Sequence, residues 1–224
     1  MAMDVWSDPN LDERLRRQID RGFDDLDKSS FSPALAYGRH RGPAAGLARQ
    51  SLRHAAVLIA LMRCEGQWMI PLTLRPMTLS HHGGQICLPG GQIEPHETPM
   101  EAALREFHEE LGVAAHVRMH CGQLRNQYVF GSDNRVHPMV ATIDSPDTEW
   151  RPDPVEVDQV ILLPLRILLN ADSHTTLKRS KPVRQDGTVV DQLVYSAPAI
   201  EYDNHVIWGA TAMILEELAQ ILHS

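Results

Sequence analysis

Cysteine is scarce in this sequence, and its spacing argues against both a disulfide-linked protein and a zinc-binding one. The three cysteines, Cys64, Cys87 and Cys121, are odd in number, and none belongs to a Cys-x-x-Cys pair. Neither a disulfide framework nor a zinc site is therefore expected. This usage fits a reducing compartment best, so we expect a cytoplasmic protein.

Long apolar runs and an excess of basic charge are also missing. No apolar run approaches the roughly 20 residues that a membrane-spanning helix needs, and the acidic N-terminus is unlike a signal peptide. The formal net charge of −8 argues against nucleic-acid or membrane partners, because these attract basic patches. An acidic protein can still bind a phosphate ester where a metal ion and a few arginines line the pocket.

The composition divides the chain into an N-terminal segment, residues 1–50, and a larger domain, residues 51–224. Apolar residues at helical spacing in the first part predict an amphipathic helix: Leu11, Leu15, Ile19, Phe23 and Leu26. We expect this helix to pack on the main domain, with a partner-binding helix as the alternative. Residues 29–50 are rich in proline and glycine and resemble a linker.

The larger domain mixes strand and helix patterns. We expect strands at 55–62, 68–74, 117–124, 136–143, 157–163 and 189–195, with a hairpin turn at Gly66. We expect helices from about Thr98 to Gly112, around 165–169 and at 210–222. This order predicts an α/β domain with a mixed sheet and helices against it.

The stretch GQIEPHETPMEAALREFHEELGV, from Gly91 to Val113, organises the rest. Glu106, Glu109 and Glu110 fall at i, i+3 and i+4, so one helix face carries all three carboxylates. Like charges at this spacing repel one another, whereas hard cations such as Mg²⁺ or Mn²⁺ prefer such oxygen ligands. The alternative reading is a solvated acidic face.

The stretch resembles the Nudix box at every defining position. These positions are Gly91, Glu97, Arg105, Glu106, Phe107, Glu109, Glu110, Gly112 and Val113. The resemblance implies the Nudix fold, an α/β/α sandwich with a mixed β-sheet and a catalytic loop-helix-loop. It also implies metal-dependent hydrolysis of a diphosphate linkage.

The preceding segment LTLRPMTLSHHGGQICLPGG, from Leu72 to Gly91, resembles the extra signature of the coenzyme A diphosphatase branch. The matching positions are Leu72, Thr73, Arg75, Leu79, His82, Gly84, Gln85, Ile86, Pro89, Gly90 and Gly91. Pro76, Ser80 and Leu88 depart from it, and at position 80 the usual residue is arginine. The implied reaction splits coenzyme A or its derivatives into 3′,5′-ADP and (acyl-)4′-phosphopantetheine. The alternatives are a Nudix pyrophosphatase for ADP-ribose, NADH or a dinucleotide, and a non-catalytic Nudix ligand-binding module.

Roles follow for individual residues. The expected metal ligands are Glu106, Glu109, Glu110 and the carbonyl of Gly90. The expected catalytic group comprises Glu109, Glu106, Arg105, Glu97 and Glu156, with Glu109 as our first choice for a ligand with base character and Arg105 as the partner that orients Glu97. The expected substrate-binding residues are Arg75, His82, Gln85, Gly90 and Gly91. The partner is a small nucleotide substrate, and a homodimer is one expected assembly.

Overall fold

The computed structural model describes residues 5–22, 34–35, 53–79, 83–129, 134–185 and 188–224. Its helices are α1 (Leu11–Arg21), α2 (Pro99–Leu111), α3 (Leu165–Leu168) and α4 (Ala210–His223), with 3₁₀ turns at Val5–Ser7 and Ala171–Ser173. Its strands are β1 (Ala34–Leu35), β2 (Arg53–Cys64), β3 (Gln67–Leu74), β4 (Ile86–Cys87), β5 (Gly90–Gln92), β6 (Val117–Gln123), β7 (Gln127–Val129), β8 (Asn134–Ile143), β9 (Gln159–Pro164), β10 (His174–Gln185), β11 (Thr188–Tyr202) and β12 (His205–Trp208).

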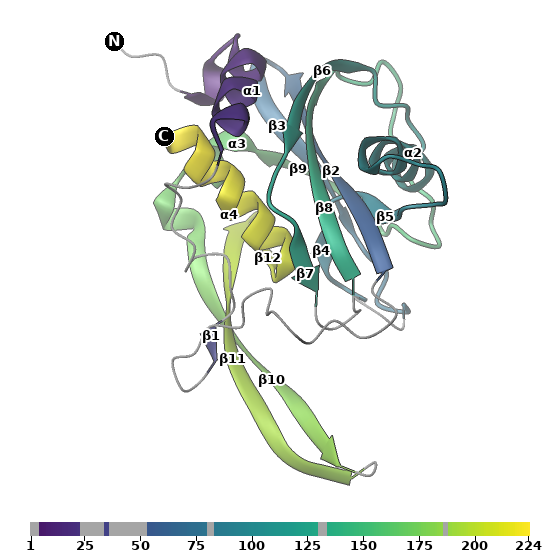
Figure 1. The fold of residues 1–224 in the computed structure, drawn as a ribbon, viewed down its shortest axis with the longest axis vertical. Coiled ribbons are helices and arrows are strands. Elements are labelled where there is room, and N and C mark those ends of the chain that lie inside the picture. The colour runs from purple at the N-terminus through teal and green to yellow at the C-terminus, as the bar shows by residue number, and fades with distance from the viewer. Residues whose placement is uncertain (1–4, 23–33, 36–52, 80–82, 130–133, 186–187) are drawn as a thin grey trace.

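A mixed eight-stranded sheet forms the centre of the molecule. Its strand order is β4-β3-β2-β8-β6, and β5, β7 and β9 pair with β2, β8 and β3. The β2–β8 pair is parallel, and the other pairs are antiparallel. Helix α2 covers one face, and α1, α3 and α4 cover the other (Figure 1). The expected α/β/α sandwich is thus confirmed.

Strand β2 shows how the sequence produces these layers. Successive side chains of a strand point to opposite faces. Ala56 and Leu58 accordingly pack in the cluster that contains α2, whereas Ile59 and Leu61 pack in the cluster that contains α1 and α4. This strand is apolar from Ala55 to Met62 because both of its faces are covered there.

The N-terminal helix α1 packs on the sheet. Leu11, Leu15 and Ile19 are buried in the same core as α4, and Arg14 Nη2 donates a hydrogen bond of 2.8 Å to the carbonyl of Leu222. The expectation that this helix packs on the main domain is confirmed. Phe23, Leu26 and most of the expected linker lie outside the described residues.

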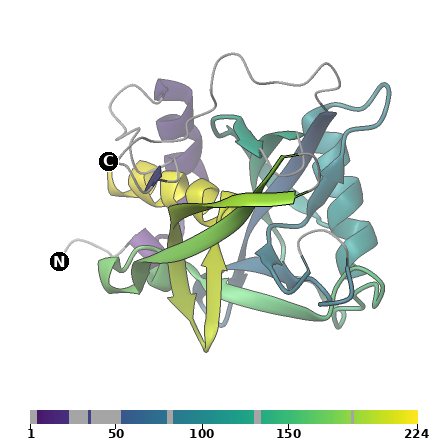
Figure 2. The same cartoon turned by 90° about the horizontal axis from the view of Figure 1, so that it is seen from below.

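A second sheet, which the sequence patterns did not predict, extends from the body. Strand β10 pairs over its whole length with β11, and β1 and β12 also pair with β11. The two long strands form a ribbon that projects away from the central sheet (Figures 1 and 2). The expected strand at 189–195 is only part of β11, and β10 was not expected. Exposed polar residues such as Lys178 and Ser180 leave β10 without the apolar alternation of a half-buried strand.

The described helices include none that is long and apolar enough to cross a membrane. The three cysteines are free thiols.

A buried ion pair fastens α4 to the sheet. Glu217 is fully buried, and its Oε1 accepts hydrogen bonds of 3.1 Å from both the backbone N–H and the Nε of Arg125. We expect Arg125→Met to lower the free energy of unfolding by about 3 kcal/mol, because it leaves a buried carboxylate without its counter-charge. Urea unfolding at pH 7 measures this loss. Arg118→Met, which removes an exposed ion pair, is the matched control, and equal midpoints for the two variants would contradict the assignment.

His174, at the start of β10, joins α3 and α4. Its Nδ1 forms an ion pair with Glu216, and its Nε2 donates to the carbonyl of Leu168. The Glu216 carboxylate raises the pKa of His174 above 6.5, and the imidazolium lowers the pKa of Glu216 below 4.5. The pair therefore stabilises the fold fully between these ordinary values, and its contribution is lost as the pH rises through the raised histidine pKa.

We expect His174→Gln to lower the free energy of unfolding by about 1–2 kcal/mol at pH 6 and by clearly less at pH 9. Thermal unfolding of both proteins at the two pH values checks this difference. A loss that is as large at pH 9 as at pH 6 would rule out a charged pair.

Candidate functional site

Helix α2, which carries the three carboxylates, is capped by a side chain at its N-terminal end and ended by a glycine at its C-terminal end. Thr98 is its N-cap: the Thr98 hydroxyl accepts from the N–H of Glu101, and the Glu101 carboxylate accepts from the N–H of Thr98. Gly112 ends the helix with φ of +67°. A Cβ at Gly112 would lie 2.0 Å from the carbonyl oxygen of Arg151, so only glycine fits there. The predicted limits of this helix are confirmed.

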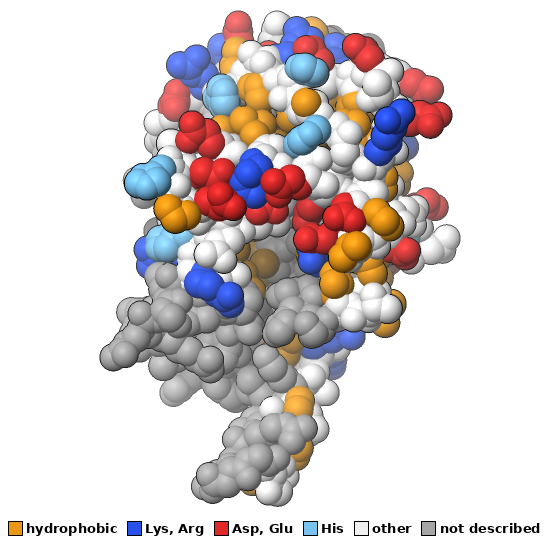
Figure 3. All heavy atoms as spheres, turned by 90° about the vertical axis from the view of Figure 1, so that its right-hand side faces the viewer, with side chains coloured by type: hydrophobic (Ala, Val, Ile, Leu, Met, Phe, Trp, Pro, Cys, Tyr) orange, Lys and Arg blue, Asp and Glu red, His pale blue; other side chains and the backbone are white. Residues whose placement is uncertain are grey.

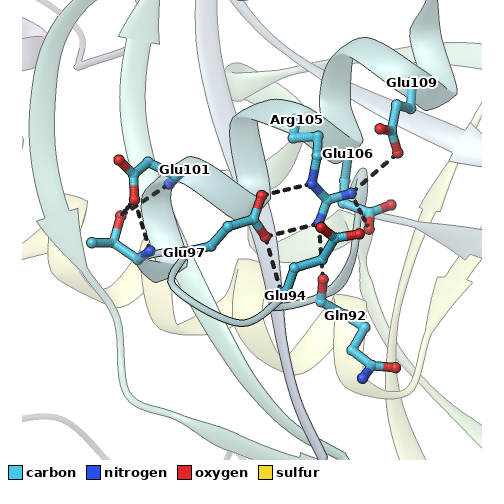
Figure 4. A network of polar contacts seen from close by, with 8 residues as sticks. Gln92, Glu94, Glu97, Glu101, Arg105, Glu106 and Glu109 are labelled. Atoms are coloured by element: carbon cyan, nitrogen blue, oxygen red, sulfur yellow. Dashed lines mark hydrogen bonds and ion pairs between the residues drawn. The ribbon is translucent and has the colours of Figure 1, made fainter.

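Arg105 is the hub of a polar network at the start of the site (Figure 4). Its guanidinium binds Glu97 through two hydrogen bonds, with Nε–Oε1 at 2.8 Å and Nη2–Oε2 at 3.0 Å. Its Nη1 lies 2.9 Å from Glu106 Oε1 and 3.1 Å from Glu109 Oε2, and its Nη2 donates to the carbonyl of Gln92. One arginine thus fixes the loop before α2 to two of the three helix carboxylates.

The Glu106 carboxylate rests against the backbone of Gly91. A Cβ at Gly91 would lie only 2.4 Å from the carboxyl carbon and Oε1 of Glu106. Burial raises the pKa of Glu106, Arg105 opposes this effect, and the charges of Glu109 and Glu156 raise the pKa further. Glycine at position 91 therefore makes room for a carboxylate that is costly to ionise in this place.

Glu110 lies deepest, with 3% of its side chain exposed. Its Oε2 accepts from the N–H of Gly90, and its Oε1 lies 3.3 Å from Arg75 Nη1. Burial raises its pKa to about 8, against the opposing effects of Arg75 and the Gly90 N–H; the charges of Glu156 and Glu106 raise it further. Three carboxylates from two segments therefore act on one another here.

The segment before the box packs directly against these carboxylates. Arg75 binds Glu110 and also lies 3.7 Å from Glu156, in the loop before β9. Arg75 was expected to bind substrate, and the structure places its guanidinium between two carboxylates. The backbone carbonyl of Gln85 accepts a hydrogen bond from the backbone N–H of Arg75, which joins the two ends of this segment.

One residue that was expected to bind substrate cannot be placed, and two backbone contacts of the site were not expected. His82 and Ser80 lie outside the described residues. The backbone contacts of Gln92 to Arg105 and of Glu94 to Glu97 have no signature in the sequence, since any residue type can make them.

The side chains suit a hard divalent cation by their chemistry. In the described part of the chain, no three His, Cys, Asp or Glu side chains are gathered as a ready metal site, and the carboxylates are shared between Arg105 and Arg75. The donors are nevertheless all oxygens. Burial raises the pKa of Glu106 and Glu110, and the charge of a bound cation would offset this cost of ionising them. On the α2 side of the molecule, Asp and Glu side chains gather around a basic one (Figure 3).

This chain is similar in sequence to proteins of one known family. The sequence model of the NUDIX domain matches residues 52–182. The uncharacterized Nudix hydrolase NudL of Photorhabdus laumondii is 34% identical over 169 residues, which cover 75% of this chain and 84% of the relative. The mitochondrial coenzyme A diphosphatase NUDT8 of Homo sapiens is 34% identical over 173 residues, 75% of this chain and 69% of the relative. A crystal structure of the Nudix hydrolase RenU from M. smegmatis is 23% identical, with a TM-score of 0.42 over 59% of this chain and 78% of that one. The domain match spans more than half of the chain and includes the glycine loop, the capped helix and its carboxylates, and with it this chain belongs to the Nudix hydrolase family.

Proposed function

We propose that this protein hydrolyses the diphosphate linkage of coenzyme A or its derivatives with the help of Mg²⁺ or Mn²⁺, giving 3′,5′-ADP and (acyl-)4′-phosphopantetheine. The observation that carries this substrate is the segment from Leu72 to Gly91, which resembles the CoA-type signature and reaches Glu110 through Arg75 and Gly90. The human relative, named as a coenzyme A diphosphatase, supports the same substrate.

The proposed metal ligands are Glu106, Glu109, Glu110 and the carbonyl of Gly90. A bound divalent ion would neutralise the diphosphate oxygens and so permit attack by water. Arg105 and Glu97 hold the loop and helix in register, so that the Glu106 and Glu109 carboxylates keep their places. Because Gly91 has no Cβ, the Glu106 carboxylate can lie directly against its backbone.

Glu109 is the proposed general base. Its side chain is 57% exposed and its described contact is to Arg105, so water can reach the carboxylate. In the reaction, a water oxygen forms a bond to one phosphorus while the bond from that phosphorus to the bridging oxygen breaks. Glu109 takes the proton of the attacking water, and the other phosphate leaves with the bridging oxygen. Glu156, 47% exposed beside Arg75, is the second candidate.

Side-by-side turnover of CoA, ADP-ribose and NADH with Mg²⁺ or Mn²⁺ tests the proposal. We expect CoA to have the highest kcat/KM, with 3′,5′-ADP and 4′-phosphopantetheine as products. Rapid cleavage of ADP-ribose with CoA untouched would favour the alternative of another nucleoside diphosphate substrate. Tight binding without turnover of any diphosphate would favour a non-catalytic module, although the chain keeps Glu97, Glu106, Glu109 and Glu110.

A further inference from the structure

Two histidines form a contacting pair on neighbouring strands of the central sheet. His54 Nδ1 and His137 Nε2 lie 2.9 Å apart, and the two rings are stacked with their centroids 5.2 Å apart. One ring donates to the other through these atoms, which leaves His54 Nε2 and His137 Nδ1 outside this bond. His54 is exposed and His137 is half-buried, so a solute can reach the pair.

The pair lies on the same face of the sheet as the carboxylate helix. His54 comes two residues before Ala56, which packs in the α2 cluster, and a strand returns to the same face every two residues. His137 is the cross-strand partner of Ala56 in β8, and Gly91 is the partner of Ala56 in β5. Gly91, Ala56 and His137 therefore form one row across three strands, with the Glu106 carboxylate at the Gly91 end.

The spacing of this row suits one nucleotide. Neighbouring strands are about 4.8 Å apart, so the Cα atoms of Gly91 and His137 are about 10 Å apart. A ribose with phosphates on its 5′ and 3′ carbons bridges a distance of this order. The backbone of His54 is also tied to the box, because its carbonyl accepts a 3.0 Å hydrogen bond from the N–H of Ile93.

The charge around the pair suits an anion. Arg135 is the direct cross-strand partner of His54, and its side chain is exposed. Burial lowers the pKa of His137, and the charges of His54 and Arg135 lower it further, so Arg135 acts on this imidazole electrostatically. An anion at the pair would relieve this repulsion and could accept hydrogen bonds from the guanidinium and, when one of the two imidazoles is protonated, from both rings. Although the chain has a net charge of −8, basic groups therefore lie beside the carboxylates of the site.

We propose that His54, His137 and Arg135 bind the 3′-phosphate of the substrate and thereby select CoA over diphosphates that lack it. This inference rests on the proposed function and deepens it. CoA carries a phosphate monoester on its ribose, separate from the diphosphate that is cleaved. ADP-ribose, NADH and dephospho-CoA lack this group, so the three residues set specificity and take no part in bond cleavage.

The test compares CoA with dephospho-CoA in the full-length protein and in the variants His54→Gln, His137→Gln and Arg135→Gln. We expect the wild type to prefer CoA, and each variant to lose about 10-fold or more in kcat/KM for CoA, mainly through KM, since each removes a charge-assisted hydrogen bond. The values for dephospho-CoA should stay the same. His116→Gln and Arg118→Gln are the matched controls. Both residues are exposed and lie near Asp144, which follows the C-terminal end of β8, whereas Arg135 and His137 lie near its N-terminal end.

Calorimetry with adenosine 3′,5′-bisphosphate and AMP separates this inference from the proposed function. We expect the wild type to bind the bisphosphate about 10-fold more tightly than AMP, and the three variants to bind both alike. If the wild type cleaves CoA but the variants lose CoA and dephospho-CoA turnover equally, the inference is wrong and the proposed function stands. If the wild type cleaves no CoA, the proposed function is wrong, and equal affinity for the two nucleotides would then overturn the inference as well.

Discussion

Glu109→Gln is expected to lower kcat for CoA about 10³-fold, the range in which removal of a general base falls. Glutamine keeps the length of the side chain and can still accept the hydrogen bond from Arg105, whose Nη1 lies 3.1 Å from Glu109 Oε2. It cannot take a proton from water, and it lacks the charge that a divalent ion requires of a ligand. Steady-state turnover of CoA with product identification measures the loss.

The control for this substitution is Glu201→Gln, which changes the same functional group at an exposed position on β11. We expect its kcat to equal that of the wild type and the melting temperatures of all three proteins to agree closely. An unchanged kcat in Glu109→Gln would rule out both assigned roles of Glu109. A large fall in its melting temperature would point to a structural role instead.

Gly91→Ala is expected to lower kcat/KM for CoA about 100-fold, as displacements of a catalytic group by about 1 Å do. The new methyl group would lie 2.4 Å from the Glu106 carboxyl carbon and would push this carboxylate away from its place. The carboxylate is the far end of a flexible side chain, so it can move at little cost to the fold. Activity and stability should therefore separate in this variant.

Gly112→Ala provides the contrast on the same helix. Its methyl group would lie 2.0 Å from a backbone oxygen, that of Arg151, at a residue whose φ is +67°. We expect a loss of stability of at least 1 kcal/mol, from the strained φ and the backbone clash. A melting temperature that falls as much in Gly91→Ala as in Gly112→Ala would contradict the view that Gly91 is required for the position of Glu106.

The sequence is most informative where local pattern and tertiary structure agree. Thr98 and Gly112 set the ends of α2 through their own side chain and backbone freedom, so the helix could be predicted to within a residue. The centre of strand β2 was predicted because burial on both faces makes residues 55–62 continuously apolar. The pairing of Arg105 with Glu97 was also expected, from the resemblance to the Nudix box, and in the structure it consists of two hydrogen bonds.

Contacts between distant segments could not be predicted in the same way. Arg75 and Glu110 are 35 positions apart, and His54 and His137 are 83 positions apart. Only the order of strands in the sheet brings these residues together, and single-sequence periodicity carries no information on that order. Strand β10 was missed for another reason: most of its described residues are exposed, so its sequence lacks the pattern that burial imposes.

The packing of α1 against α4 has a consequence for synthesis on the ribosome. Residues of α4 such as Ile214 and Leu218 fill the core on the same face of the central sheet as α1 (Figure 1), although 208 positions separate Arg14 from its partner Leu222. Leu11 and Leu15 of α1 therefore lack part of their final packing until α4 has been made and has left the exit tunnel. This face of the sheet is completed late, and we expect the nascent chain to remain a chaperone substrate until then.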